Sequence, residues 1–328
     1  MSKHIVLVSG LLAIGLGIFA DSSVHAQPYP SKPVRMIIAF PPGGASDGPA
    51  RIMGSSFSQQ TGQQFILENR AGASGIIGVE AVAKSTPDGH TLLVASASNV
   101  ITQALFQYQN KPLPFDMVSG FQHVAVYGIT SSVIVANPKV AAKSIKELVE
   151  FLKPRPGSLT YGSPGNGTAS HLAMEMLKQH LGVDITHVPY KAAATASVDL
   201  LSGQIDLSIG AVFAFVQHIQ SGKLRALAVT TRERSAQLPD VPTVAESHPG
   251  YESTGWAGLF MPANTPKEVV ERLEQMVNRA LQEPKTRDAL LAVGMTPSFM
   301  SSRDATAKVK SDLDRYSDVV RRAKMTID

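Results

Sequence analysis

The sequence predicts an α/β protein built from two lobes, and three observations support this. Segments typical of strands and of helices alternate along the whole chain of 328 residues. The strand candidates are mostly continuous apolar runs, as expected where helices cover both faces of a mostly parallel sheet. The alternation restarts near residue 131 and returns near residue 231, so the chain is expected to cross between the lobes twice.

Residues 1–26 are expected to be a cleaved signal peptide. Lys3 and His4 give a weakly basic start, Ile5 to Ala20 is an apolar run, and Val24-His25-Ala26 is a plausible small-residue cleavage site. The run is shorter than the roughly 20 residues that span a bilayer, so a permanent N-terminal anchor is the weaker alternative. The mature protein is therefore expected to be secreted.

The composition excludes several classes of protein. The chain has no cysteine, which excludes a lipid anchor at the cleavage site, disulfides and thiolate metal sites. The net charge of +4 is spread along the chain without a basic tract, so nucleic-acid binding has no support. Neither a nucleotide-binding glycine motif nor H-E-x-x-H is present, and no cofactor or metal is expected.

The first lobe is expected to contain residues 27–130 and the returning segment 240–328, and the second lobe residues 131–239. In the first lobe the pattern predicts strands at 34–40, 65–69, 91–95, 121–129 and 256–261, and helices at 45–60, 76–84, 266–282, 285–293 and 302–324. In the second it predicts strands at 133–136, 159–162, 185–189, 207–210 and 224–230, and helices at 145–152, 169–181, 194–202 and 215–221.

A glycine-rich turn follows the first strand candidate. Phe40-Pro41-Pro42-Gly43-Gly44 ends the apolar run, and Ser46 or Asp47 is placed to cap the helix after it. The free N–H groups at a helix N-terminus attract anions, carboxylates included. An ordinary βα turn without a ligand is an equally good interpretation of this segment alone.

A second such loop occupies the corresponding place in the other lobe. Ser163-Pro164-Gly165-Asn166-Gly167-Thr168 also follows a strand and precedes a helix, with Thr168 placed as its N-cap. Ligands of open α/β sheets bind outside the carboxyl ends of the strands. The pair therefore favours a cleft in which two helix N-termini clamp a carboxylate over the alternative that each loop only ends its own strand. Ser96 to Asn99 is a further small polar loop at a strand end.

Other polar residues have structural explanations beside functional ones. Asp47 and Arg51 have the spacing of an i,i+4 ion pair. His171 and His187 are expected to be structural, and a hydrolase using Ser163 and His171 is disfavoured because no G-x-S-x-G elbow is present. A solvated loop explains Tyr190 and Lys191, and a strand edge explains Asp206, about as well as contact with a ligand does.

Six segments together resemble the substrate-binding receptors of tripartite tricarboxylate transporters, the Bug family. They are YPSKPVRMIIAFPPGGASDGPAR, ENRAGASGIIGVEAVAKSTPDGHTLLVAS, LTYGSPGNGTASHLAMEML, THVPYKAAATASVDLLSGQID, GKLRALAVTTRERSAQLPDVPTVAES and GWAGLFMPANTPKEVVERL. The resemblance covers essentially the whole mature chain. It departs from the family at Ala192, where relatives carry glycine, and residues 103–120 match poorly.

The resemblance implies a monomeric, periplasmic binding protein of the Venus flytrap type (type II) that delivers a small organic acid to a membrane permease without catalysis. A ligand-sensing protein acting on a membrane signalling partner shares the same pocket and is the alternative. By the resemblance, the turn and the loop pinch the carboxylate, the segment 96–99 completes the near wall, and the distal pocket sets ligand identity. The implied ligand-binding residues are Phe40, Pro41, Gly43, Gly44, Ser46, Asp47, Ser96, Asn99, Ser163, Gly167, Thr168, Tyr190, Lys191, Asp206 and Phe213.

Overall fold

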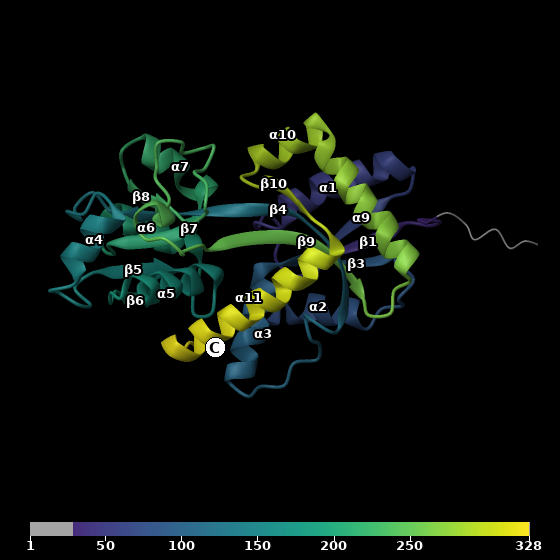
Figure 1. The fold of residues 1–328 in the computed structure, drawn as a ribbon, viewed down its shortest axis with the longest axis horizontal. Coiled ribbons are helices and arrows are strands. Elements are labelled where there is room, and N and C mark those ends of the chain that lie inside the picture. The colour runs from purple at the N-terminus through teal and green to yellow at the C-terminus, as the bar shows by residue number, and fades with distance from the viewer. Residues whose placement is uncertain (1–28, 328) are drawn as a thin grey trace, which may run out of the picture.

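The computed structural model describes residues 29–327, so the expected signal peptide lies outside the described residues. Figure 1 shows two groups of helices and strands joined through the long strands β4 and β9. The strands are β1 (Val34–Ile38), β2 (Phe65–Asn69), β3 (Thr91–Ser96), β4 (Phe121–Ala136), β5 (Thr160–Ser163), β6 (Thr186–Pro189), β7 (Leu207–Ala211), β8 (Arg225–Val229), β9 (Thr254–Pro262) and β10 (Thr296–Met300). The helices are α1 (Asp47–Thr61), the 3-10 turn η1 (Ala73–Gly75), α2 (Ile76–Ala83), α3 (Ala97–Tyr108), α4 (Ile145–Leu152), α5 (Ala169–Leu181), α6 (Ala193–Ser202), α7 (Val212–Gln220), α8 (Val244–Ser247), α9 (Lys267–Gln282), α10 (Pro284–Ala292) and α11 (Ser302–Ala323).

The strands form one ten-stranded sheet in the order β2-β1-β3-β9-β4-β7-β5-β6, and β8 and β10 also pair with β4. The pairs among β1, β2 and β3 and among β5, β6 and β7 are parallel, as expected. β4 and β9 run antiparallel to their neighbours, so the sheet is mixed at its centre. The difference arises because the chain crosses the centre in one direction through β4 and returns in the other through β9.

Strand β4 is one continuous strand of 16 residues, where the sequence predicts two strands separated near residue 131. Up to Ser131 it pairs with β9, and from Ser132 onward it pairs with β7. We call the part that contains β1, β2, β3, β9 and β10 the first lobe and the part that contains β5 to β8 the second. The polar residues near 131 remain extended because partner strands continue on both sides.

Helix α3 was not predicted, because Ser96 to Asn99 was expected to be a loop. Asn99 Oδ1 accepts a hydrogen bond from the Ser96 N–H at 2.8 Å, and this contact fixes the start of the helix. Neither β10 nor the short helix α8 was predicted. The other elements agree with the predicted ones to within a few residues, and β2 and α5 have the predicted bounds.

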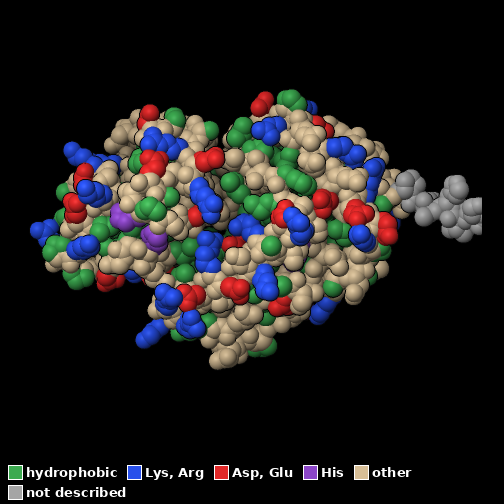
Figure 2. Space-filling model, in the orientation of Figure 1, with side chains coloured by type: hydrophobic (Ala, Val, Ile, Leu, Met, Phe, Trp, Pro, Cys, Tyr) green, Lys and Arg blue, Asp and Glu red, His purple; other side chains and the backbone are tan. Residues whose placement is uncertain are grey.

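The two lobes share an apolar core on one side. The core contains Leu105 of α3, Leu172 of α5 and Val320 of α11, all nearly inaccessible to solvent. Helix α11 runs from beside β9 toward α5 (Figure 1), and the space-filling view shows a shallow notch at the upper edge between the halves (Figure 2). Within residues 29–327, no helix is long and apolar enough to cross a membrane.

Candidate functional site

A cavity of about 220 Å³ lies where four helices begin. It is lined by Ser46 at the start of α1, Ser96 at the start of α3, Ser170 in the first turn of α5 and Ala211 at the start of α7. The first N–H groups of a helix have no partner within the helix and carry partial positive charge. Two helix N-termini from each lobe therefore make the cavity suited to an anion.

The two crossing strands supply another side of the cavity. Thr130 and Ser132 lie two residues apart on β4, and Thr254 and Trp256 do so on β9, so each pair points to one face of its strand. Thr130 is paired with Gly255 across the two strands. A bound solute would therefore contact the strands that join the lobes.

The charge of a ligand would have to be recognised without charged side chains. Of the residues that the structure describes, no Asp, Glu, Lys, Arg or His lines this cavity, and its polar groups are hydroxyl groups, backbone groups and the indole N–H of Trp256. Hydroxyl groups and helix N–H groups donate hydrogen bonds to a carboxylate without becoming deprotonated. Within residues 29–327, the site thus has donors for an anion and no charged acid–base pair or metal-ligand set.

The turn before α1 is held by a carboxylate. Gly43 has φ = +76°, a conformation that favours glycine, and its N–H donates to Asp47 Oδ2 at 3.1 Å. Asp47 is buried and also accepts from Arg51 Nη2 at 3.0 Å and Asn69 Nδ2 at 3.0 Å. The guanidinium of Arg51 is the main cause that lowers the pKa of Asp47 below its usual value. Asp47 therefore shapes the turn, and the neighbouring Ser46 lines the cavity.

The loop before α5 is held by hydroxyl groups and histidine. Thr168 Oγ1 donates to the Gly165 carbonyl at 2.8 Å and accepts from the His171 N–H at 3.3 Å, as an N-cap does. The Gly167 N–H donates to His171 Nδ1 at 3.1 Å. Gly167, at φ = +72°, also lies against Leu105 of α3, where a Cβ would be 2.8 Å from the leucine. This loop presents Ser170 to the cavity.

A stacked aromatic cluster supports this loop from behind. The rings of His171 and His187 lie 4.0 Å apart, and His187 stacks on Tyr161 at 4.7 Å. Burial is the main cause that lowers the pKa of His171 to about 3, so the ring is neutral and Nδ1 can accept a hydrogen bond. Ser163 Oγ lies 2.7 Å from His187 Nε2 and, among the described residues, forms no hydrogen bond with His171; Ser163 is fully buried. The Ser163–His171 hydrogen bond that a hydrolase would need is therefore not formed among the described residues.

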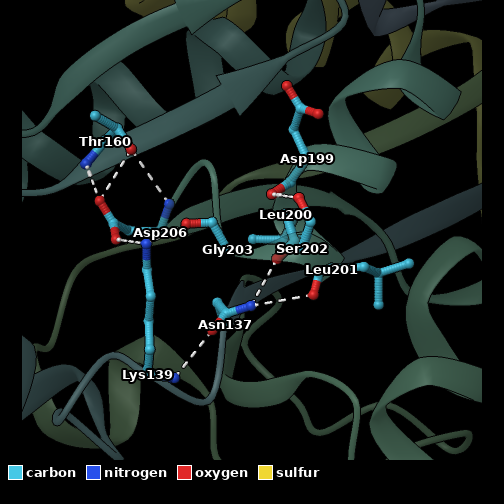
Figure 3. A network of polar contacts seen from close by, with 9 residues as sticks. All are labelled: Asn137, Lys139, Thr160, Asp199, Leu200, Leu201, Ser202, Gly203 and Asp206. Carbon is cyan, nitrogen blue, oxygen red and sulfur yellow. Dashed lines mark hydrogen bonds and ion pairs between the residues drawn. The ribbon is translucent and has the colours of Figure 1, made fainter.

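Three of the expected distal residues do not line the cavity. Tyr190 donates to Asp199 Oδ2 at 2.7 Å. Asp206 accepts from the Thr160 N–H at 2.8 Å and lies 3.2 Å from Lys139 Nζ (Figure 3). Lys191 is exposed. Asp206 precedes β7, whereas the cavity lies at the other end of that strand, which at about 3.3 Å per residue is roughly 13 Å away.

The remaining predicted residues lie around the cavity without forming its lining. Phe213 of α7 is 43% exposed and lies against Gly294 of the first lobe, where a Cβ would be 2.7 Å from its ring. Asn99 is buried behind Ser96. The cavity lining includes Ser46 and Ser96 but not Phe40, Pro41, Gly43, Gly44, Asp47, Asn99, Ser163, Gly167, Thr168 or Phe213.

The sequence reasoning missed several lining residues. Thr130 and Ser132 interrupt an apolar run, and this interruption was a usable signal that was taken for a strand break. Ser170 immediately follows the predicted loop. Trp256 and Tyr316 had no local signal, because an aromatic residue in a strand or a long helix is most often part of the core.

The chain is similar to known proteins over most of its length. The family model described as "Tripartite tricarboxylate transporter family receptor" matches residues 50–325. The chain is similar to Protein BugT of Bordetella pertussis, with 34% identity over 319 residues, which are 97% of each chain. It is also similar to two solved structures of Rhodopseudomonas palustris proteins. Rpa4515 with adipate has 31% identity and a TM-score of 0.77 over 91% of this chain and 99% of that one. MatC with bound malate has 28% identity and a TM-score of 0.72 over 89% and 100%.

Proposed function

Because the chain belongs to the tripartite tricarboxylate transporter receptor family, we propose that it captures a small carboxylate-bearing organic solute between its lobes and delivers it to a membrane permease. The family consists of solute-binding receptors with the periplasmic binding protein fold, and not of enzymes. We also propose that the mature receptor works in the periplasm after removal of residues 1–26.

One observation carries the proposal: the N-termini of α1, α3, α5 and α7 meet at one cavity that has no charged lining side chain among the described residues. Such N–H groups suit a carboxylate. The adipate and malate bound by the two R. palustris proteins are both carboxylates, which supports the same ligand class here.

The clamp is proposed to close by rotation of one lobe against the other about β4 and β9. Residues 27–130 with 240–328 would then form one domain and residues 131–239 the other. The exchange of β4 partners between Ser131 and Ser132 supports this division. The first lobe would contribute Ser46 and Ser96 to the clamp, and the second Ser170.

A charge placed at Ser170 tests the clamp. Ser170→Asp adds a carboxylate beside the site, and an acidic residue in the first turn of a helix does not destabilise the helix. We expect calorimetry to show adipate or malate binding at least tenfold weaker than in the wild type. Ser170→Asn, which has nearly the same shape and no charge, is the matched control and should change affinity less than threefold. Equal affinities for the Asp and Asn variants would contradict an anion site.

Delivery to a permease needs a separate experiment. Vesicles that contain the cognate permease should take up labelled adipate or malate only when the wild-type receptor is present on the outside. A receptor that binds the solute normally and gives no uptake would contradict transport, and stimulation of a membrane kinase in the same vesicles would favour the sensing alternative.

A further inference from the structure

One part of the cavity wall is apolar and aromatic. Trp256 of β9, Met295, Tyr316 of α11, Ile101 of α3 and Leu172 of α5 all line it. Trp256 and Tyr316 are almost fully buried, at 2% and 3% exposure. These side chains offer no charge to a ligand, so they can favour only an uncharged part of it.

The indole of Trp256 is held in place by a buried carboxylate. Its Nε1–H donates to Asp312 Oδ2 at 2.8 Å, and Asp312 is 3% exposed. Two cations face the same carboxylate from α11: Lys308 Nζ at 3.1 Å and Arg315 Nη2 at 2.9 Å. Because the carboxylate is paired on both oxygens, the position of the indole is fixed from outside the cavity.

The same group of residues also holds the start of β9. Arg315 Nη1 donates to the Glu252 carbonyl at 3.0 Å, and Glu252 immediately precedes the cavity residues Ser253 and Thr254. Tyr316 lies four residues from Asp312, so both are on one face of α11. Helix α11 therefore contributes Tyr316 to the wall directly and orients Trp256 through Asp312.

We propose, building on the proposed function, that Trp256 and Tyr316 form the surface that receives the carbon body of the solute, and that Asp312 is the positioning residue of this surface. The solute class is then a carboxylate with an extended apolar chain, as opposed to a hydroxy acid or a tricarboxylate. A hydroxyl or a third carboxylate placed against indole, methionine and leucine side chains would lose its hydrogen bonds to water without replacement.

Three probes of increasing polarity test the ligand class: adipate, malate and citrate. Adipate has more methylene groups than malate and no hydroxyl, and each buried methylene favours binding severalfold. We expect calorimetry to give adipate an affinity on the order of tenfold higher than that of malate, with citrate the weakest. Malate or citrate binding as tightly as adipate would overturn the inference.

The emission of Trp256 reports the wall itself, because this is the only tryptophan of the chain. Adipate should change the wavelength or the intensity of its fluorescence at the same concentrations at which calorimetry shows binding. Calorimetric binding without any change in emission would show that the solute does not contact this wall.

Two substitutions of Asp312 separate positioning from general stability. Asp312→Leu removes the acceptor of the indole N–H, whereas Asp312→Asn keeps an acceptor oxygen. We expect Asp312→Leu to alter the emission of the ligand-free protein and to reduce the ratio of adipate to malate affinity toward one. In Asp312→Asn the logarithm of this ratio should be at least half of its wild-type value. A stability defect alone would lower both affinities together and leave the ratio unchanged, which would overturn the role of Asp312.

Tyr316→Ala is the second variant, in case Asp312→Leu does not fold, and it should weaken adipate more than malate. A Tyr316→Ala protein with the wild-type ratio of adipate to malate affinity would contradict the proposal that Tyr316 contacts the solute. Failure of the wild type to bind adipate, malate and citrate would contradict the proposed function, and with it the inference, whereas binding with equal affinities would contradict the inference alone.

Discussion

The turn before α1 is held by a carboxylate that is paired with a guanidinium, whereas the loop before α5 is held by hydroxyl groups and a neutral imidazole. In the first, Asp47 binds Gly43, Arg51 and Asn69. In the second, Thr168 and His171 bind the glycine backbone. Both arrangements bring a helix N-terminus to the same cavity. The two glycine-rich segments therefore bring helix N-termini to one cavity through supports that titrate in different pH ranges.

The largest expected difference between the two supports is their acid sensitivity. Burial lowers the pKa of His171 to about 3, whereas an unfolded histidine has a pKa of about 6.5. Between these values the unfolded chain binds a proton that the folded chain does not, so the free energy of unfolding falls as the pH falls from about 6.5 toward 3. The slope from one such group is at most about 1.4 kcal/mol per pH unit, or about 2–3 kcal/mol from pH 6 to pH 4.

The carboxylate support also loses its contribution on acidification, but at a lower pH. The lowered pKa of Asp47 means that its contribution is complete above the ordinary carboxyl pKa and is lost only as the pH falls through the lower folded value. Urea unfolding at several pH values from 7 to 4.5 measures the slope. His171→Gln should flatten it and Asp47→Asn should not. An unchanged slope in His171→Gln would show that another group, such as His187, controls the acid response.

The next largest effect is expected from removing the Asp47 carboxylate. Asp47→Ala leaves the Gly43 N–H, Arg51 and Asn69 without their acceptor, and we expect the free energy of unfolding at pH 7 to fall by about 2 kcal/mol. Adipate affinity should fall about tenfold, because the turn that presents Ser46 loses its support. Denaturant unfolding and calorimetry measure the two quantities.

Arg51→Ala is the matched control for this variant. The Arg51 side chain is half exposed, so its removal should cost less than 1 kcal/mol and leave the Gly43 contact intact. If Arg51→Ala were as costly as Asp47→Ala, the ion pair and not the support of the turn would account for the effect.

The smallest effect is expected in the α5 loop at neutral pH. Thr168→Ala removes one N-cap, worth about 1 kcal/mol, and leaves the N–H groups of α5 in place. Adipate affinity should fall only severalfold, and Thr168→Ser should restore it. Thermal unfolding and calorimetry of the wild type, Thr168→Ala and Thr168→Ser measure stability and adipate affinity. If Thr168→Ala lost more stability and affinity than Asp47→Ala, the α5 loop and not the α1 turn would be the more important support.

Much of the fold could be predicted because its signals are local. Apolar runs located β1, β2 and β3, and the capping residues Thr168 and Gly182 located the ends of α5. The two glycine-rich segments located the two helix N-termini. Strand β4 was divided in error, since Thr130 to Ser132 are polar and only the presence of partner strands on both sides keeps them extended.

The distal part of the site could not be predicted in the same way, because it depends on strand order and direction. Tyr190 follows β6, which is the last strand at one end of the sheet order, away from the crossing strands. Asp206 lies at the amino end of β7, and the rule that ligands bind at carboxyl ends would already have favoured Ala211. Tyr316 reaches the cavity from a helix far along the chain, and no local pattern marks it.

The length of β4, which runs through both lobes as one strand of 16 residues, constrains how the lobes can move. A loop can pivot at one or two residues, whereas β4 stays paired along its length, with β9 up to Ser131 and with β7 from Ser132 onward. A rotation of one lobe against the other would therefore be distributed as a small twist over many residues of β4. We therefore expect a narrow range of opening angles between the lobes.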